Sequence, residues 1–220
     1  MHFAKKYMLI IKRVLDIIIS TILIMLILPL IIALSILIWF DDGRPIFFKQ
    51  KRIGLNYREF ELLKFRSMRV NNVLVEQMGQ VKEDNPLVTH VGRVIRRLKI
   101  DELPQLFNVL FGVMSLVGPR PTISEQVKNY EEFEKTRLLM KPGMTGWAQV
   151  NGNTHLSWEE RIKLDIWYIN HWSLLLDFSI IFKTIKVIIF GEQPKNKAIK
   201  EASDFALRAS RNGREFTHNT

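Results

Sequence analysis

The stretch LKIDELPQLFNVL, residues 98–110, places two adjacent carboxylates, Asp101 and Glu102, just before a proline and an apolar run. Pro104 lacks a backbone N–H and is best tolerated in a helix's first turn, so we expect both acids near the start of a helix running through Leu110. A helix start offers free N–H groups and a positive dipole end, which favour ionised carboxylates and bound phosphate. Taken alone, the stretch favours a structural role, with Asp101 as N-cap and Glu102 as a first-turn acid.

The residues on both sides of this stretch favour phosphate chemistry instead. Residues 118–121, GPRP, hold Arg120 between two prolines, and such a guanidinium can bind phosphate through two hydrogen bonds at little entropic cost. Adjacent helical residues point about 100° apart, so Asp101 and Glu102 can differ in role. One can act as nucleophile or metal ligand while the other orients groups or handles protons. A basic run precedes the acids: Arg93, Arg96, Arg97 and Lys99.

The composition indicates an anionic partner without identifying it. The chain has 220 residues, a formal net charge of +10 and a pI near 9.9. Such a balance suits nucleic acid, anionic lipid or a phosphorylated substrate. The absence of cysteine excludes a disulfide framework, a cysteine-based zinc site and a cysteine nucleophile.

The segment Ile17–Phe40 carries no charge and is longer than the ~18 apolar residues expected of a membrane-crossing helix. It is too long for a signal peptide, and no small-residue cleavage site follows it. Pro29 lies near its middle, where it removes a backbone hydrogen bond and bends or breaks a helix. Basic residues flank both ends, so we predict a re-entrant membrane helix over residues 1–42 with both ends on one face. A single proline-kinked crossing is the alternative.

Two short strands are expected over residues 45–54 and 60–68, joined by a turn at Asn56-Tyr57. Lys64 and Arg66 alternate with apolar residues in the second strand. A period of two places both cations on one face, which is either solvated or directed at a substrate.

Helices and loops are expected over most of the remaining chain. Residues 71–92 predict a surface loop with a short helix, and residues 125–140 predict one amphipathic scaffold helix. The apolar run 174–190 is interrupted by three charges and suits a helix in the membrane interface, with a buried helix pair as the alternative. Asp165 lies among aromatic residues and either pairs with a cation or contributes to a site. The charged tail, residues 192–220, is expected to be mobile.

Ordered sequence blocks resemble a known family over nearly the whole chain. The blocks are KRVLD (12–16), FKQ (48–50), KFRSM (64–68), DELPQL (101–106), VGPRP (117–121) and the segment from KPG (141–143) to Gly152. Together they resemble the monotopic phosphoglycosyl transferases, also called bacterial sugar transferases, which start glycan assembly on a polyprenyl phosphate carrier. The resemblance is to the minimal catalytic form, without the extra N-terminal membrane helices of larger members.

The resemblance implies a two-step reaction at the cytoplasmic face of the bacterial inner membrane. Asp101 would attack the β-phosphate of a UDP-sugar and release UMP, and polyprenyl (undecaprenyl) phosphate would then take the phosphosugar from the carboxylate. Magnesium near Asp101 would offset the diphosphate charge, and Glu102 would assist as ligand or proton handler. The remaining implied roles are phosphate binding by Lys64, Arg96 and Arg120, support of the site by Asp165, and the helix break at Pro29.

Three positions depart from the family pattern. Lys99 stands where members often carry Ser or Thr, so the helix capping before Asp101 must differ. Leu28 replaces a Ser that often precedes the helix-breaking proline. Asn153 replaces an Arg that often follows Gly152, which puts a nucleotide contact there in doubt.

We therefore expect an α+β, mostly helical fold in three parts: the re-entrant membrane helix 1–42, a cytoplasmic catalytic domain 43–191 with interfacial helices and a small β-hairpin, and the tail 192–220. The expected partners are a UDP-sugar, polyprenyl phosphate and membrane lipid, without nucleic acid, and a homodimer is left open. The alternative is a non-catalytic, membrane-anchored basic adaptor that binds anionic lipid or nucleic acid. A third hypothesis is a membrane phosphatase or a glycosyl transferase that releases UDP. The sugar and the glycan pathway are not indicated.

Overall fold

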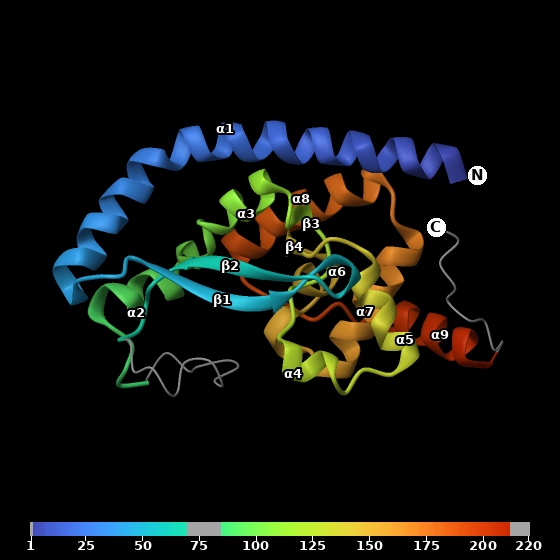
Figure 1. Cartoon of the computed structure of the whole chain (residues 1–220). Coiled ribbons are helices and arrows are strands. Elements are labelled where there is room, and N and C mark those ends of the chain that lie inside the picture. The colour runs from blue at the N-terminus through green and yellow to red at the C-terminus, as the bar shows by residue number, and fades with distance from the viewer. Residues whose placement is uncertain (1, 70–84, 212–220) are drawn as a thin grey trace.

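The computed structural model describes residues 2–69 and 85–211, which form a mostly helical α+β structure with two small sheets (Figure 1). The fold class expected from the sequence is therefore confirmed. The loop expected over residues 71–92 falls largely outside the described residues, up to residue 84. The elements are α1 (His2–Asp42), β1 (Phe47–Ile53), η1 (Leu55–Tyr57), β2 (Glu59–Phe65), α2 (His90–Arg97), η2 (Ile100–Glu102), α3 (Gln105–Phe111), β3 (Ser115–Val117), α4 (Ser124–Val127), α5 (Glu132–Lys135), η3 (Thr136–Leu139), β4 (Gly143–Thr145), α6 (Trp147–Val150), η4 (Asn153–His155), α7 (Trp158–His171), α8 (Leu174–Phe190) and α9 (Asn196–Arg211).

Helix α1 is long and apolar enough to cross a membrane, with a mean hydropathy of 3.1 in its most apolar window. Only 17% of that window is buried, so most of its apolar side chains face outward. Figure 1 shows α1 running along one side of the domain and bending in its second half, the half that contains Pro29. A proline inside a helix removes one backbone hydrogen bond and clashes with the preceding turn, which accounts for a bend there.

Both ends of α1 are bonded to the same domain. Near the N-terminus, Lys12 Nζ forms a buried ion pair with Asp177 Oδ2 of α8 at 2.6 Å. Near the C-terminus, Asp41 Oδ2 accepts a hydrogen bond of 2.9 Å from the backbone N–H of Val91 in α2. The apolar part of the helix lies between these two polar attachments.

Strands β1 and β2 form the expected antiparallel hairpin, in register from Phe47↔Phe65 to Ile53↔Glu59. The alternating cations are not solvated. Lys64 reaches Glu102, as described below, and Arg66 is buried, where its Nη2 donates to the carbonyls of Asp42 and Gly43 at 2.7 and 2.8 Å. The second cation therefore fastens the hairpin to the end of α1.

Strands β3 and β4 pair in parallel, and glycines permit their close approach. A Cβ on Gly118 would lie 2.3 Å from the carbonyl oxygen of Lys141, and one on Gly143 would lie 2.0 Å from the backbone nitrogen of Gly118. Only glycine fits at such distances. This tight pair fixes the backbone that leads directly into Pro119-Arg120-Pro121.

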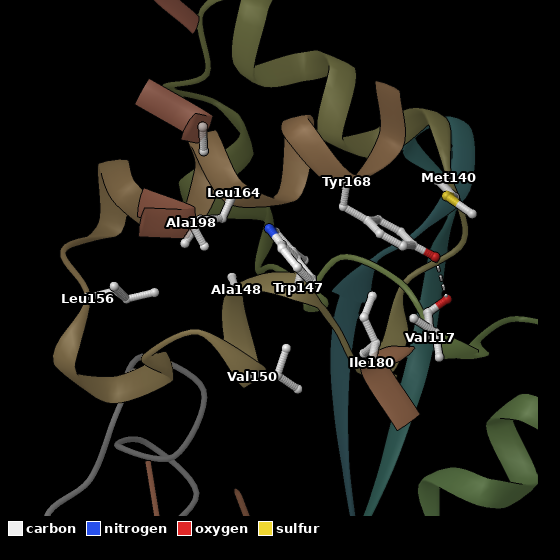
Figure 2. Close-up of a cluster of buried hydrophobic side chains, with 11 residues drawn as sticks. Val117, Met140, Trp147, Ala148, Val150, Leu156, Leu164, Tyr168, Ile180 and Ala198 are labelled. Carbon is white, nitrogen blue, oxygen red and sulfur yellow. Dashed lines mark hydrogen bonds between the residues drawn. The ribbon is translucent and has the colours of Figure 1, made fainter. Parts of the chain in front are cut away.

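The main core lies between β3, α6, α7, α8 and α9 (Figure 2). Tyr168 of α7 is completely buried there, and its hydroxyl lies 3.4 Å from the carbonyl of Val117 and donates to Asp177 Oδ1 at 2.6 Å. The sequence left open whether the C-terminal helices lie in the membrane interface or form a buried pair. Burial is correct for α7. Helix α8 instead keeps an exposed apolar face that includes Leu175, Phe178, Phe182, Ile185, Ile188, Ile189 and Phe190.

The expectation of a mobile tail is wrong for Asn196–Arg211, which forms α9 and packs against α7. Ala198, Ala202 and Ala206 recur every four residues, and all three are buried. Small side chains on one helix face let a second helix approach closely. The prediction failed because it counted only large apolar residues.

The single helix expected over residues 125–140 is also wrong, because α4, α5 and η3 share that stretch. A capping box between Glu131 and Glu134 starts α5 afresh. The bend between α4 and α5 buries Tyr130, and Arg137 of η3 is buried as well. The segment is thus more than outer scaffold, since Arg137 supports the site described next.

Candidate active site

Asp101 and Glu102 lie in the 3₁₀ turn η2, directly before α3, for which Pro104 is the N-cap. The predicted position at a helix start is therefore confirmed to within one turn. Lys99 adopts a left-handed conformation with φ of 56°, which ends α2 and redirects the chain into η2. The two acids are carried by a short, sharply turned connection between two helices.

Glu102 is held by two cations from distant segments. Its Oε1 accepts hydrogen bonds from Lys64 Nζ of β2 at 2.7 Å and from Arg120 Nη2 at 3.2 Å. Burial acts to raise the pKa of Glu102, but Arg120 and Lys64 outweigh it and lower the pKa to about 2. Glu102 is therefore ionised and orients the side chains of Lys64 and Arg120.

The pKa of Asp101 is shifted in the opposite direction from that of its neighbour Glu102. Burial raises the pKa of Asp101, and the charge of Glu102 adds to this effect, while Lys64 and Arg96 oppose it. A carboxylate with a raised pKa is the more basic of the pair. The structure thus brings Lys64, Arg96 and Arg120, all predicted from the sequence, to the two acids.

Glu102 lines a pocket together with Arg52, a residue that was not predicted from the sequence. The pocket is bounded by Arg52, Leu62, Lys64, Glu102, Gln105, Arg120, Pro121, Gly143 and Met144. The Arg52 guanidinium donates to Gln50 Oε1 at 2.7 Å and to the carbonyl of Pro121 at 3.2 Å. Burial and the neighbouring Arg120 lower the pKa of Arg52 to about 10, against the opposing effect of Glu102. Alternation along β1 was the available signal, because Gln50 and Arg52 share its more buried face.

The pocket has an excess of positive charge. Arg52, Lys64 and Arg120 line it together with a single acidic side chain, Glu102. Three cations fixed around one carboxylate form a site that a further anion would neutralise. Phosphate groups suit such a set, because guanidinium and ammonium donors match their oxygens.

Asp165 does not line this pocket and instead forms a buried ion pair. Its Oδ2 lies 2.7 Å from both Nε and Nη2 of Arg137, and both side chains are at most 2% exposed. Burial raises the pKa of Asp165, and Arg137 opposes the rise. Arg137 also donates to the hydroxyl of Tyr130 at 2.8 Å and to the carbonyl of Arg120 at 3.1 Å. Asp165 therefore supports the site through Arg137, which holds the backbone of Arg120.

A resident metal centre built by protein side chains alone is not present in the described parts of the chain. Within residues 2–69 and 85–211, no three His, Cys, Asp or Glu side chains gather in a way that could hold a metal ion. Magnesium commonly uses one or two carboxylates and takes its other ligands from substrate phosphates and water. Asp101, beside a cationic pocket whose charges suit phosphate groups, fits that mode of binding.

Two helices that lie near α1 carry exposed apolar side chains. Figure 1 shows α3 and α8 close to α1, and α3 follows directly from Glu102 and Pro104. Phe111 of α3 is 71% exposed and Phe190 of α8 is 75% exposed. Exposed apolar side chains of this size are typical of surfaces that contact a membrane.

Comparison with known proteins agrees with this geometry. The family model for bacterial sugar transferases matches residues 7–191. The uncharacterized sugar transferase EpsL of Bacillus subtilis is 45% identical over 150 residues, which are 68% of this chain and 73% of that protein. The UDP-N-acetylgalactosamine-undecaprenyl-phosphate N-acetylgalactosaminephosphotransferase of Aeromonas hydrophila is 46% identical over 82% of this chain. The undecaprenyl-phosphate galactose phosphotransferase of Salmonella typhimurium is 39% identical over 86% of it.

The matches differ in how much of each relative they span. They cover 44% of the Aeromonas protein and 42% of the Salmonella protein, so this chain corresponds to less than half of either. The stretch matched by the family model, residues 7–191, includes every residue of the cationic pocket. The chain belongs to the bacterial sugar transferase family.

Proposed function

We propose that this protein transfers a sugar 1-phosphate from a UDP-sugar to undecaprenyl phosphate and releases UMP. The observation that carries the proposal is the pairing of Asp101 with a pocket in which Arg52, Lys64 and Arg120 surround Glu102. Relatives named as undecaprenyl-phosphate sugar phosphotransferases support the same reaction class. The product would start the assembly of a bacterial glycan such as an exopolysaccharide or capsule.

Asp101 is the proposed nucleophile. One of its carboxylate oxygens attacks the β-phosphorus of the UDP-sugar, and the bond from that phosphorus to the bridging oxygen breaks, so UMP leaves with the electron pair. A phosphate oxygen of the carrier then attacks the same phosphorus, and the bond to Asp101 breaks. The raised pKa of Asp101 supports this role, because a more basic carboxylate is a better nucleophile.

The cations are proposed to bind the diphosphate and to stabilise the charge that develops on the transferring phosphoryl group. Glu102, whose pKa is about 2, is a poor proton acceptor at neutral pH. Its contribution is to hold Lys64 and Arg120 in position. Magnesium bound by Asp101 and the substrate phosphates would offset further negative charge.

The membrane arrangement is proposed to be re-entrant, at the cytoplasmic face of the inner membrane. A helix that crossed the bilayer would place its two ends on opposite sides. Here Lys12 and Asp41, near opposite ends of α1, both bond to the domain that carries Asp101. This supports entry and exit of α1 on one face, and the outward apolar residues of α8 would rest in the interface.

The decisive experiment measures nucleotide release by the purified protein in detergent with magnesium, undecaprenyl phosphate and a panel of UDP-sugars. UMP release that requires the carrier, the metal and Asp101 is the expected result, and the panel identifies the sugar. UDP release instead would indicate transfer of the sugar without its phosphate. A folded protein that releases no UMP with any sugar, and that keeps its lipid binding when Asp101 is changed to Asn, would favour the basic adaptor.

A further inference from the structure

The side chain of Glu192, in the link between α8 and α9, joins two loops that are far apart in the sequence. Its Oε1 forms an ion pair with Lys99 Nζ and accepts a hydrogen bond of 2.8 Å from Asn153 Nδ2. Its Oε2 accepts from the backbone N–H and the hydroxyl of Thr154 at 3.2 and 2.5 Å. The Glu192 side chain is only 8% exposed, whereas that of Lys99 is 56% exposed. Four donors thus converge on one carboxylate.

Both loops held by Glu192 contain residues in the left-handed backbone region. Lys99 has φ of 56°, and Asn153 has φ of 41° after Gly152 with φ of 145°. Residues other than glycine adopt this conformation at a cost in free energy, and they keep it only where surrounding contacts hold it. The bonds to Glu192 provide such contacts to Lys99 and Asn153 at once.

The link that carries Glu192 is itself fixed on the Gly152 loop. The backbone N–H of Lys195 donates to the carbonyl of Asn151 at 3.0 Å. A Cβ on Gly152 would lie 3.2 Å from the Cα of Pro194, so the link passes directly over that glycine. Glu192 therefore extends from a fixed backbone and can act as an anchor for other segments.

The anchored loops adjoin the candidate active site. Lys99 stands two residues before Asp101 and ends the turn that leads into η2. Arg161, whose Nη2 lies 3.4 Å from the carbonyl of Thr154, has a lowered pKa because of burial and then of Arg120, and Glu192 opposes the shift. Arg161, which contacts the Gly152 loop at Thr154, is thus within electrostatic range of Arg120 in the pocket.

We propose that Glu192 is a positioning residue, which holds Lys99 against the 152–154 loop and thereby sets the orientation of Asp101 toward the bound diphosphate. The inference rests on the proposed function. It goes beyond the family match, which ends at residue 191. It also gives the departures at Lys99 and Asn153 one shared explanation, because both side chains bind the same oxygen of Glu192.

The test is a double-mutant cycle of Glu192→Gln and Lys99→Ala, with UMP release as the activity. Each single variant is expected to lower kcat on the order of tenfold with little change in KM for the UDP-sugar, because a misplaced nucleophile slows chemistry more than binding. The double variant is expected to be no slower than the slower single one, since both changes break the same link. Glu132→Gln, which removes an exposed ion pair with Lys135 on α5, is the control and keeps wild-type kcat.

Hydrogen exchange of the backbone amides of residues 99–103 provides a readout that does not depend on turnover. We expect faster exchange there in the single and double variants, with the wild-type melting temperature retained. Wild-type kcat in Glu192→Gln, or losses that multiply in the double variant, would overturn the inference. So would unchanged exchange, or a loss of activity that only follows a loss of folded protein. If the wild-type protein itself releases no UMP, the proposed function fails, and the exchange measurement still decides whether Glu192 orders the Asp101 turn.

Discussion

The pocket around Glu102 and the buried pair of Arg137 with Asp165 both combine a carboxylate with guanidinium groups, but the charges balance in only one of them. Arg137 and Asp165 are almost fully buried and satisfy each other, and the remaining donors of Arg137 reach Tyr130 and the carbonyl of Arg120. In the pocket, three cations face Glu102 alone. A balanced buried pair has no charge left for a ligand, and removing one partner destabilises the fold, whereas an excess of one charge leaves capacity for a ligand of the opposite sign.

The largest effect is expected from Asp101→Asn, which removes the proposed nucleophile beside the cationic pocket. UMP release should fall by about 10³-fold or more, because covalent transfer needs that carboxylate. The fold should survive, since burial disfavours the Asp101 carboxylate and the change removes that partly buried charge. Steady-state assays beside thermal melting of the same preparation check both statements. A variant that kept substantial turnover would remove Asp101 from the chemistry.

Changes to the Arg137–Asp165 pair should lower the stability of the fold instead of slowing the reaction. Asp165→Asn leaves the Arg137 guanidinium buried without its counter-charge, which typically costs about 3–5 kcal/mol. We expect a large drop in melting temperature, with activity lost in proportion to the folded fraction. The double replacement Arg137→Met with Asp165→Leu should recover much of the stability. An Asp165→Asn protein that melted normally but had no activity would instead place Asp165 in the catalytic machinery.

A smaller effect is expected from Arg52→Gln in the cationic pocket. Loss of one of three cations should raise KM for the UDP-sugar about tenfold, as expected for a charge-assisted contact with phosphate. The melting temperature should change little. Lys49→Gln is the matched control, because Lys49 lies on the same strand with a 60% exposed side chain that pairs with Glu61. Equal effects of the two changes would mean that only overall charge matters.

The smallest effects concern pH and separate the two neighbouring acids. The pKa of Asp101 is raised in the folded protein, so its ionised form costs stability at neutral pH, and Asp101→Asn should raise the melting temperature there. That gain should shrink as pH falls through the folded pKa. Glu102→Gln should do the opposite: it destabilises at neutral pH, and the difference fades only as pH falls toward about 2. Melting curves over pH for both variants test the signs, and parallel curves would contradict them.

The fold was predictable wherever a local pattern carries the information. The antiparallel hairpin followed from alternation around Asn56-Tyr57, and the placement of Asp101 beside α3 followed from Pro104. Helix α9 was not predicted, because its buried face consists of alanines whose contribution depends on the close fit to α7. The break before α5 was missed for a related reason, since the burial of Tyr130 that goes with it is a tertiary contact.

Most residues of the candidate site could be predicted from the sequence, but the contacts that hold them in place could not. Asp101, Glu102, Lys64, Arg96 and Arg120 were all proposed from motifs, and the structure brings them together. Arg52 could have been found by following the alternation of β1, which places it on the same face as Gln50. Arg137 and Glu192 carry no local signal, because each acts on partners that are brought near only by folding.

The amino-acid order alone specifies the long apolar helix, the basic character of the chain and the acidic pair beside a proline-held arginine. These properties follow from the identity and spacing of neighbouring residues, which set hydropathy, charge and helix starts. The tertiary structure decided which charges meet: Lys64 with Glu102 across 38 residues, and Arg137 with Asp165 across 28. Electrostatic balance depends on distances through space, which the spacing of residues along the chain does not encode. Only the folded chain therefore distinguishes the pocket of Arg52, Lys64 and Arg120, which can accept a further anion, from the Arg137–Asp165 pair, whose charges already neutralise each other.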